Sequence, residues 1–365
     1  MPAPPLVPSL RVRWRQIQRP VLRAGDLLAP RRWIGLVLFG LLAAICFFGA
    51  PLGLLNDYQQ LLFMYAGINV ILCVSLNLVN GYMGEFSIGH AGFMAVGAYA
   101  SSLLTVRALP EGGAWLGPVA VLAGGLAAAI AGLVIAVPSF RTRGDYLAIV
   151  TLAFTMIVKS GLENLEWVGG GRGLAGMRKL TTLPWVFAWT VLAVAAVRNL
   201  VYSRFGRAIQ AIREDELAGL LSGVETRRVK LIAFTVSAFL AGTAGALYAH
   251  LVLFITPRGF DLLKSTDVLI MVYLGGIGSI LGSILGATVY TALLEILRPL
   301  GVWRMVCLPL LLVLLMIFRP HGILGLRELP WLVPQRDRDV LRRRGSPGSG
   351  ERDGSPAGGD RGGSR

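Results

Sequence analysis

Long apolar runs alternate with short polar connections along most of the chain. Most of these runs have the length of about 20 residues with which an α-helix crosses a bilayer. The pattern predicts spans at Trp33–Ala50, Leu61–Val79, Ser87–Val106, Leu116–Val137, Tyr146–Leu162, Pro184–Tyr202, Leu231–Phe254 and Val302–Phe318. We therefore expect an all-α fold, a polytopic transmembrane helix bundle of about 8–10 spans.

One further apolar run, Asp267–Leu297, is too long for a single ordinary span. Its glycine-rich sequence from Gly275 to Ser279 favours a break, at which neighbouring protein would satisfy the freed backbone groups. Counting this run once gives about nine crossings, and counting it as a broken pair gives about ten. We expect ten crossings, or nine with a re-entrant hairpin.

The chain has a net charge of +15, although only 15% of its residues are charged and 55% are hydrophobic. Arginine is concentrated in the N-terminal arm, the loop with Arg141 and Arg143, the loop 203–230 and the C-terminal tail. The connections 51–60, 108–115 and 254–266 contain little of it. The positive-inside rule then places the first group, and both termini, in the cytoplasm. These arginines flank apolar runs and form no basic folded face, so we expect no nucleic-acid partner.

Three regions follow from this distribution. We expect residues 1–32 to form a basic cytoplasmic arm, with no cleavable signal peptide before the first apolar run. Residues 33–325 form the transmembrane domain, which includes the cytoplasmic loop 203–230. Residues 326–365 contain too few apolar side chains to offset the entropy of ordering, so we expect a disordered basic tail.

Small residues predict where helices approach closely. Gly278, Gly282 and Gly286 recur at every fourth position, which places them on one helix face. Gly242 lies in a similar run, between Ala238 and Ala246. We expect these glycines to build the bundle by tight packing.

Polar residues gather at the start of the third span, in the stretch from Asn80 to Tyr99. An ionisable group at membrane depth is costly unless it faces protein or water, so Glu85 and His90, with Ser87 between them, are candidates for a function. The alternative is that Glu85 caps a helix at the boundary, paired with a loop arginine. No additional ligands stand at metal-binding spacing, and no phosphate-binding loop occurs. We therefore expect no metal, no cofactor and no catalytic site in this chain.

The run Gly84-Glu-Phe-Ser-Ile-Gly-His-Ala-Gly-Phe93 resembles the signature of the branched-chain amino acid ABC permeases. Glu85 stands where glutamine is usual in that family. Four further blocks match in order over residues 60–325: Arg143–Phe154, Phe205–Arg213 continuing to Gly223, Tyr273–Gly282 and Phe318–Gly322. The arrangement is more similar to the LivM-type member of the permease pair than to the shorter LivH-type member.

This resemblance implies the permease subunit of an importer in the bacterial inner membrane, with leucine, isoleucine and valine as substrates. It implies ABC ATPase subunits, a LivH-like second permease and a periplasmic binding protein as partners, besides the lipid bilayer. It also makes Glu85, Ser87, His90 and Thr151 candidates for the translocation pathway. Relatives with this signature also carry urea or short amides. An ion-coupled secondary transporter stays open as another class, with Glu295 as its main candidate carboxylate.

The loop 203–230 contains an amphipathic stretch, residues 207–222, that Gly223 can end in left-handed geometry. A helix outside the membrane must bury its apolar side against something. The resemblance implies a groove on the ATPase, with Arg213, Glu214, Ala218 and Gly223 as coupling residues. The alternative is a helix lying on lipid headgroups, which the acids of this loop disfavour.

The segment from Glu163 to Gly176 is expected on the periplasmic side and carries the glycine run 169–171. The resemblance implies that the binding protein docks here. The alternative is that these glycines only make the loop flexible.

Overall fold

The computed structural model describes residues 55–108, 113, 115–140, 146–318 and 322–323. The predicted arm 1–32, the first predicted span Trp33–Ala50 and the tail 326–365 lie outside the described residues. The same holds for Arg143 at the start of the second signature block.

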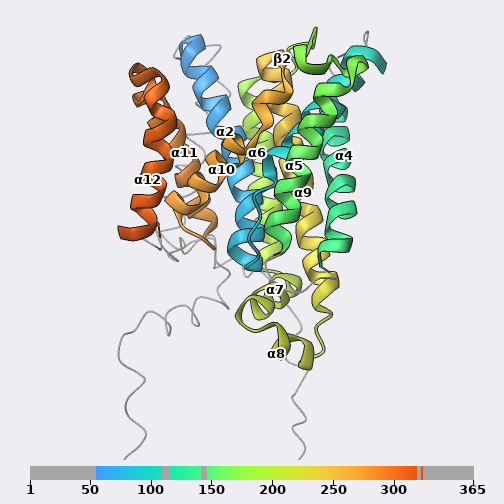
Figure 1. Ribbon diagram of the computed structural model, residues 1–365, viewed down its shortest axis with the longest axis vertical. Coiled ribbons are helices and arrows are strands. Elements are labelled where there is room, and N and C mark those ends of the chain that lie inside the picture. The colour runs from blue at the N-terminus through green and yellow to red at the C-terminus, as the bar shows by residue number, and fades with distance from the viewer. Residues whose placement is uncertain (1–54, 109–112, 114, 141–145, 319–321, 324–365) are drawn as a thin grey trace, which may run out of the picture.

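Nearly all regular structure in this part of the chain is helical (Figure 1). The bundle consists of α2 (Asp57–Asn77), α3 (His90–Leu103), α4 (Leu116–Ser139), α5 (Tyr146–Asn164), α6 (Leu183–Val201), α9 (Thr226–Val252), α10 (Leu262–Gly275), α11 (Ile280–Ile296) and α12 (Arg304–Phe318). Two shorter helices, α7 (Arg204–Glu214) and α8 (Glu216–Leu221), lie beyond one end of it (Figure 1). The remaining turns are η3 (Leu78–Met83), η4 (Leu104–Ala108), η5 (Glu166–Val168), η6 (Gly170–Arg172), η7 (Pro257–Phe260) and η8 (Arg298–Trp303).

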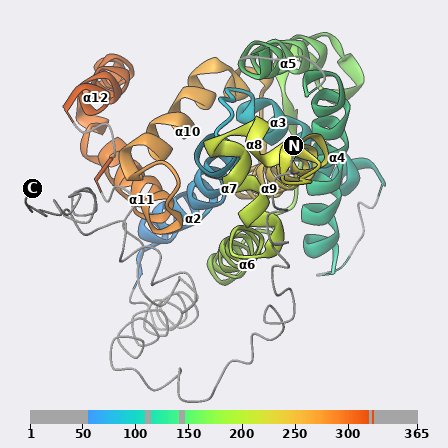
Figure 2. The ribbon, with the colours of Figure 1, turned by 90° about the horizontal axis from the view of Figure 1, so that it is seen from below.

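Five helices of the described residues are long and apolar enough to cross a membrane: α2 with η3, α4, α5, α6 and α9. This confirms the all-α, multi-span class that the apolar runs predict. Helix α9 is 67% buried over its most apolar window, whereas α5 is only 17% buried, so α9 lies inside the bundle and α5 on its outside. The end-on view in Figure 2 separates α10, α11 and α12 on one side from α4 and α5 on the other.

Helix α9 packs most extensively against α3 and α4, and glycine makes this packing possible. A Cβ on Gly97 of α3 would lie 2.2 Å from the carbonyl oxygen of Gly242, and one on Gly242 would lie 2.4 Å from Cβ of Ala128 in α4. Real Cβ atoms do not approach so closely, so the three backbones touch only because these positions have no side chain. Gly242 is therefore placed at a helix crossing.

The run predicted to break does break, and it forms an antiparallel helical pair. Helix α10 ends at Gly275 and α11 begins at Ile280, with left-handed backbone at Gly276 and Gly278 between them. The antiparallel direction follows from three close approaches, between Gly275 and Gly282, Met271 and Gly286, and Asp267 and Tyr290.

A side chain of α2 satisfies the backbone groups that this break leaves without helical partners. The amide nitrogen of Asn77 donates to the carbonyl oxygen of Ser279 at 2.9 Å and to Oγ of Ser283 at 2.7 Å. Its amide oxygen accepts from the backbone N–H of Gly278 at 2.8 Å. Asn77 is 1% exposed, so it replaces hydrogen bonds that water cannot provide there.

The predicted glycine repeat is only partly helical. Gly282 and Gly286 lie in α11 and touch the backbone of α10. Gly278 is in the turn before α11, with φ of +79°, so it does not share a helix face with them. The prediction of one face was wrong because the helix begins after Gly278, where Ser279 caps it.

The stretch 207–222, predicted as one helix, forms two helices. Asp215 has extended backbone (φ −157°, ψ 112°), and its carboxylate accepts from the N–H groups of Leu217 and Ala218 at 2.9 and 3.1 Å. An aspartate at a helix start satisfies donors that the first turn leaves free. Asp215 therefore ends α7 and begins α8. Gly223 follows α8 with φ of +81°, as its predicted role as a terminator requires.

At the other end of the bundle, a two-residue strand β1 (Leu174–Ala175) pairs antiparallel with β2 (Phe254–Ile255). The glycine-rich segment before β1 forms the turns η5 and η6, with left-handed backbone at Gly169 and Gly170. Gly173 follows these turns, and a Cβ on it would lie 2.5 Å from the carbonyl oxygen of Ile255. These glycines therefore form a defined turn rather than only a flexible link.

Gly242→Ala should lower the thermal stability of the protein in detergent, because the new methyl group meets Ala128 and the backbone of Gly124. Overpacking of this kind typically costs about 1–3 kcal/mol. The measurement is the melting midpoint by size-exclusion fluorescence. Gly161→Ala is the matched control, since a Cβ on Gly161 meets nothing within 4 Å. Equal stability of the two variants would contradict the close crossing of α4 and α9.

Candidate functional site

The signature run forms a turn, residues 84–89, that links η3 to α3. Asn80 closes the turn: its amide oxygen accepts from the N–H of Ser87 at 3.1 Å, and its amide nitrogen donates to the Ser87 carbonyl at 3.4 Å. The N–H of Ile88 donates to Oγ1 of Thr151 in α5 at 3.2 Å. Two of the predicted pathway residues, Ser87 and Thr151, therefore fix one turn against a neighbouring helix.

His90 begins α3 and is 1% exposed. Its Nε2 lies 3.1 Å from Oγ of Ser237, whose hydroxyl donates to the carbonyl of Ser75 at 2.6 Å. Because that hydroxyl proton is already used, His90 is the donor in this contact, through the proton on Nε2. This chain of bonds ties α2, α3 and α9 together in the interior.

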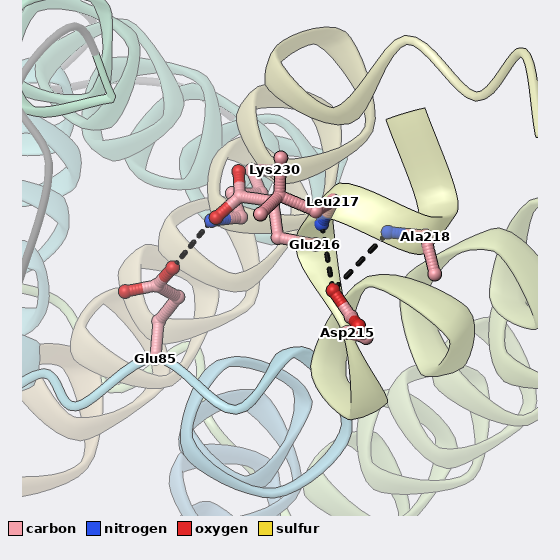
Figure 3. Close-up of polar contacts among 6 residues, drawn as sticks. All are labelled: Glu85, Asp215, Glu216, Leu217, Ala218 and Lys230. Carbon is pink, nitrogen blue, oxygen red and sulfur yellow. Dashed lines mark hydrogen bonds and ion pairs between the residues drawn. The ribbon is translucent and has the colours of Figure 1, made fainter. Parts of the chain in front are cut away.

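Glu85 takes part in a cluster of three charges at the end of the bundle (Figure 3). Nζ of Lys230, in the first turn of α9, lies 2.7 Å from a carboxylate oxygen of Glu85 and 2.9 Å from one of Glu216 in α8. The side chain of Lys230 is 10% exposed, that of Glu85 21% and that of Glu216 55%. The predicted partner of Glu85 was a loop arginine, and the structure gives a lysine of α9 instead. Lys230 joins the signature turn to α8.

A second contact joins the signature turn to α7. The methylene groups of the Arg213 side chain, in α7, cover Gly84, where a Cβ would lie 2.8 Å from Cγ of Arg213. Gly84 has φ of +78°, so both its backbone and its surroundings favour glycine. Helix α7 is held to the bundle by the buried side chains of Ile209 and Ile212.

Helix α8 is much less covered. Among its residues only Gly219 is buried, against Ile212, whereas Leu217, Leu220 and Leu221 are 71%, 56% and 86% exposed. Of the other predicted coupling residues, Ala218 lies exposed in α8 and Gly223 directly after it, while Glu214 is the exposed last residue of α7. The apolar side of α8 thus faces away from the protein, at the end shown in Figure 1.

A cavity lies at the opposite end of the bundle. It has a volume of about 500 Å³ and is lined from α2, α9, α10, α11 and α12. None of the four predicted pathway residues lines it, since Ser87, His90 and Thr151 are buried in helix contacts and Glu85 faces Lys230. The part of the chain that the structure describes also contains no cluster of three or more potential metal ligands.

Sequence reasoning missed three contributors to these sites. Lys230 is a single lysine at the start of a span, and the positive-inside pattern accounts for it without a partner. Asn77 and Asn80 lie in an apolar run with no charge to mark them. Their positions just before the signature glycines are a signal that could have found them, because irregular backbone in a membrane needs polar side chains close by.

Residues 60–318 match the family described as the permease component of the branched-chain amino acid transport system. The match spans both the signature turn and helices α7 and α8. The chain belongs to this family. It is accordingly a multi-pass membrane protein and a component of a transport system. No solved structure matches the chain.

Curated relatives of this permease family carry matching names. The high-affinity branched-chain amino acid transport system permease protein LivM of Escherichia coli is 37% identical over 294 residues, 70% of this chain and 68% of the relative. The probable LivM of Methanocaldococcus jannaschii is 25% identical over 343 residues, 79% and 99% of the two chains. The LivH protein of E. coli is 26% identical over 287 residues, 71% and 92% of the two chains. The resemblance carried by the signature blocks is therefore confirmed.

Lys230→Met should loosen α8, because it removes the ammonium that Glu216 and Glu85 share. We expect amide hydrogen exchange over residues 216–224 to become about fivefold faster, which corresponds to about 1 kcal/mol for a partly exposed ion pair. Glu85→Gln should have a smaller effect, since an amide oxygen still accepts from Lys230.

Arg228→Met is the matched control for this measurement. Arg228 pairs with Glu225 at 3.4 Å on the same helix, and both side chains are about 70% exposed. Its removal should leave exchange in α8 unchanged. If both variants accelerate exchange equally, the effect comes from net charge and not from the bond to Glu216.

Proposed function

We propose that this chain is the membrane-spanning subunit through which an ATP-driven bacterial importer carries branched-chain amino acids into the cell. The observation that carries this proposal is α8, a helix outside the bundle with exposed leucines and with Glu216 linked to the signature turn through Lys230. A partner that moves α7 and α8 together would move the turn through Arg213 and Lys230.

The partner of α8 that fits best is an ABC ATPase subunit. Exposed leucines clustered on one short helix mark an interaction surface. A groove that receives an amphipathic helix is a common way to bind one. The acids Glu214, Asp215 and Glu216 surround this helix and would be repelled by anionic lipid headgroups, which disfavours docking on the membrane. In this proposal the ATPase hydrolyses ATP and the permease carries no catalytic residue.

The remaining partners and the orientation follow from the same assignment. With α8 in the cytoplasm, the β1–β2 end faces the periplasm, where a substrate-loaded binding protein would dock on the turns η5 and η6. Trp167 of η5 is 56% exposed there, with the guanidinium of Arg107 5.8 Å from its ring centre. Both termini would then be cytoplasmic in the inner membrane. A LivH-like chain would complete the permease pair.

The substrate class rests on the relatives, whose names specify branched-chain amino acids. Urea and short amides remain substrates to be compared in the same assay. The secondary-transporter reading loses its main candidate, because Glu295 is paired with Arg298 at 3.3 Å near the surface.

Replacing Leu217 and Leu221 together by glutamate should abolish co-purification with a co-expressed ABC ATPase, because two charges would enter an apolar interface. ATP-dependent leucine uptake by proteoliposomes with added binding protein should be lost in parallel. Leu300→Glu is the matched control: Leu300 is 47% exposed, but it lies in η8 at the other end of the bundle.

The possible outcomes of this experiment test the coupling role of α8, the substrate class and the energy source separately. Assembly and leucine uptake by the unmodified complex, with loss only in the α8 variant, support it entirely. Assembly without leucine uptake but with uptake of urea or a short amide overturns the substrate class and retains the coupling role of α8. Uptake that follows an ion gradient without an ATPase overturns the proposal.

A further inference from the structure

The cavity at the end of the bundle opposite α8 combines charged, polar and apolar lining residues. It is lined by the first turns of α10, the start of α2 and the end of α11. Its volume of about 500 Å³ lies within the range of about 300–1,000 Å³ that is usual for small-molecule sites. Arg298 at its rim bonds to Glu295 at 3.3 Å and to the Tyr58 hydroxyl at 2.8 Å, which joins η8 to the start of α2.

Inside this rim, two opposite charges line the cavity from one face of α10. Lys264 and Asp267 are three residues apart, which places their side chains side by side along the helix. The ammonium of Lys264 forms no ion pair with any described carboxylate within 4 Å. Asp267 accepts a short hydrogen bond from the hydroxyl of Tyr290. Lys264 is the third residue of α10, and the charge of Asp267 acts on its ammonium across one helical turn.

The rest of the lining supplies an uncharged acceptor and an apolar wall. Asn69 donates its amide nitrogen to Oγ1 of Thr291 at 3.0 Å, so its amide oxygen remains as an acceptor. Leu62, Leu294 and the ring of Tyr65 also line the cavity. The ring of Tyr65 is fixed by that of Tyr248, with centres 6.1 Å apart.

We propose that this cavity is a binding site for a zwitterionic α-amino acid with an aliphatic side chain. Its carboxylate binds the ammonium of Lys264, its ammonium binds Asp267 and the amide oxygen of Asn69, and its side chain lies against Leu62 and Leu294. The two charges of an α-amino acid stand on one carbon atom, which matches two opposite charges one helical turn apart. This proposal rests on the proposed function, because the transported amino acid would bind in this cavity after it leaves the binding protein.

The test uses protection of a cysteine in the cavity. Thr266 lines the cavity, so Thr266→Cys is introduced after Cys46, Cys73 and Cys307 are replaced by alanine. Maleimide labelling is then measured on the purified complex, without binding protein, against increasing L-leucine. Bound leucine should slow labelling by about tenfold once its concentration is about ten times its dissociation constant.

Two analogues and two variants test the assignment of each charge. Leucinamide lacks the carboxylate and 4-methylpentanoate lacks the ammonium, so neither should protect as leucine does. Lys264→Met should raise the leucine concentration needed for protection by about tenfold or more, since a charge-assisted bond is lost. Lys159→Met, on α5 outside the cavity, is the control and should change nothing.

The outcomes distinguish this proposal from the proposed function. Protection by leucine alone, lost in Lys264→Met, supports the site. If the complex assembles and imports leucine but leucine does not slow labelling, the site is overturned and the transport function stands. Equal protection by leucine and leucinamide would overturn the role of Lys264. Protection by leucine in a chain that binds no ATPase would retain the site and overturn the ATP-driven function.

Discussion

The constraint on which the fold depends is that backbone polar groups within a membrane must be satisfied by protein. This permease breaks helical hydrogen bonding between α10 and α11, and one side chain of α2 compensates. Asn77 accepts from Gly278 and donates to Ser279 and Ser283, so it contacts both the turn and the first helical residues after it. The antiparallel pair can therefore pack by glycine contacts, which places the start of α10 and the end of α11 together at the cavity.

The sequence predicted much of this architecture, because a long apolar run in a bilayer can form few structures other than a helix. Glycine clusters in such runs mark helix breaks or close helix contacts. The break near Gly275 follows from the length of the apolar run together with its glycines. The helix starting at Asp215 and the place of Gly278 were missed for a different reason. In both cases the position of the helix start depends on which of several neighbouring residues is the N-cap. Asp215 lies within an acidic run and Ser279 follows a glycine, so the sequence does not identify the capping residue.

Predicting the functional site succeeded where residues adjoin in sequence and failed where they meet across the fold. The signature run, the amphipathic stretch before Gly223 and the family were all readable from local blocks. The partner of Glu85 is 145 residues away, and the charges of α10 face a cavity built by five helices. His90 was predicted as a pathway residue because it is an ionisable group in a span. In the structure it bonds to Ser237 and links two helices in the interior of the bundle.

The cluster around Lys230 holds one positive and two negative charges, and this stoichiometry has a consequence for how α8 can move. Glu216 is already about half exposed, so separation from Lys230 returns it to water with little loss of solvation. Lys230 and Glu85 stay behind as a neutral pair, and no isolated charge is left at the membrane boundary. A single buried lysine with α8 as its only partner would instead resist separation. The ion pair between Glu216 and Lys230 can therefore break and form again repeatedly without leaving an uncompensated ion in the bundle.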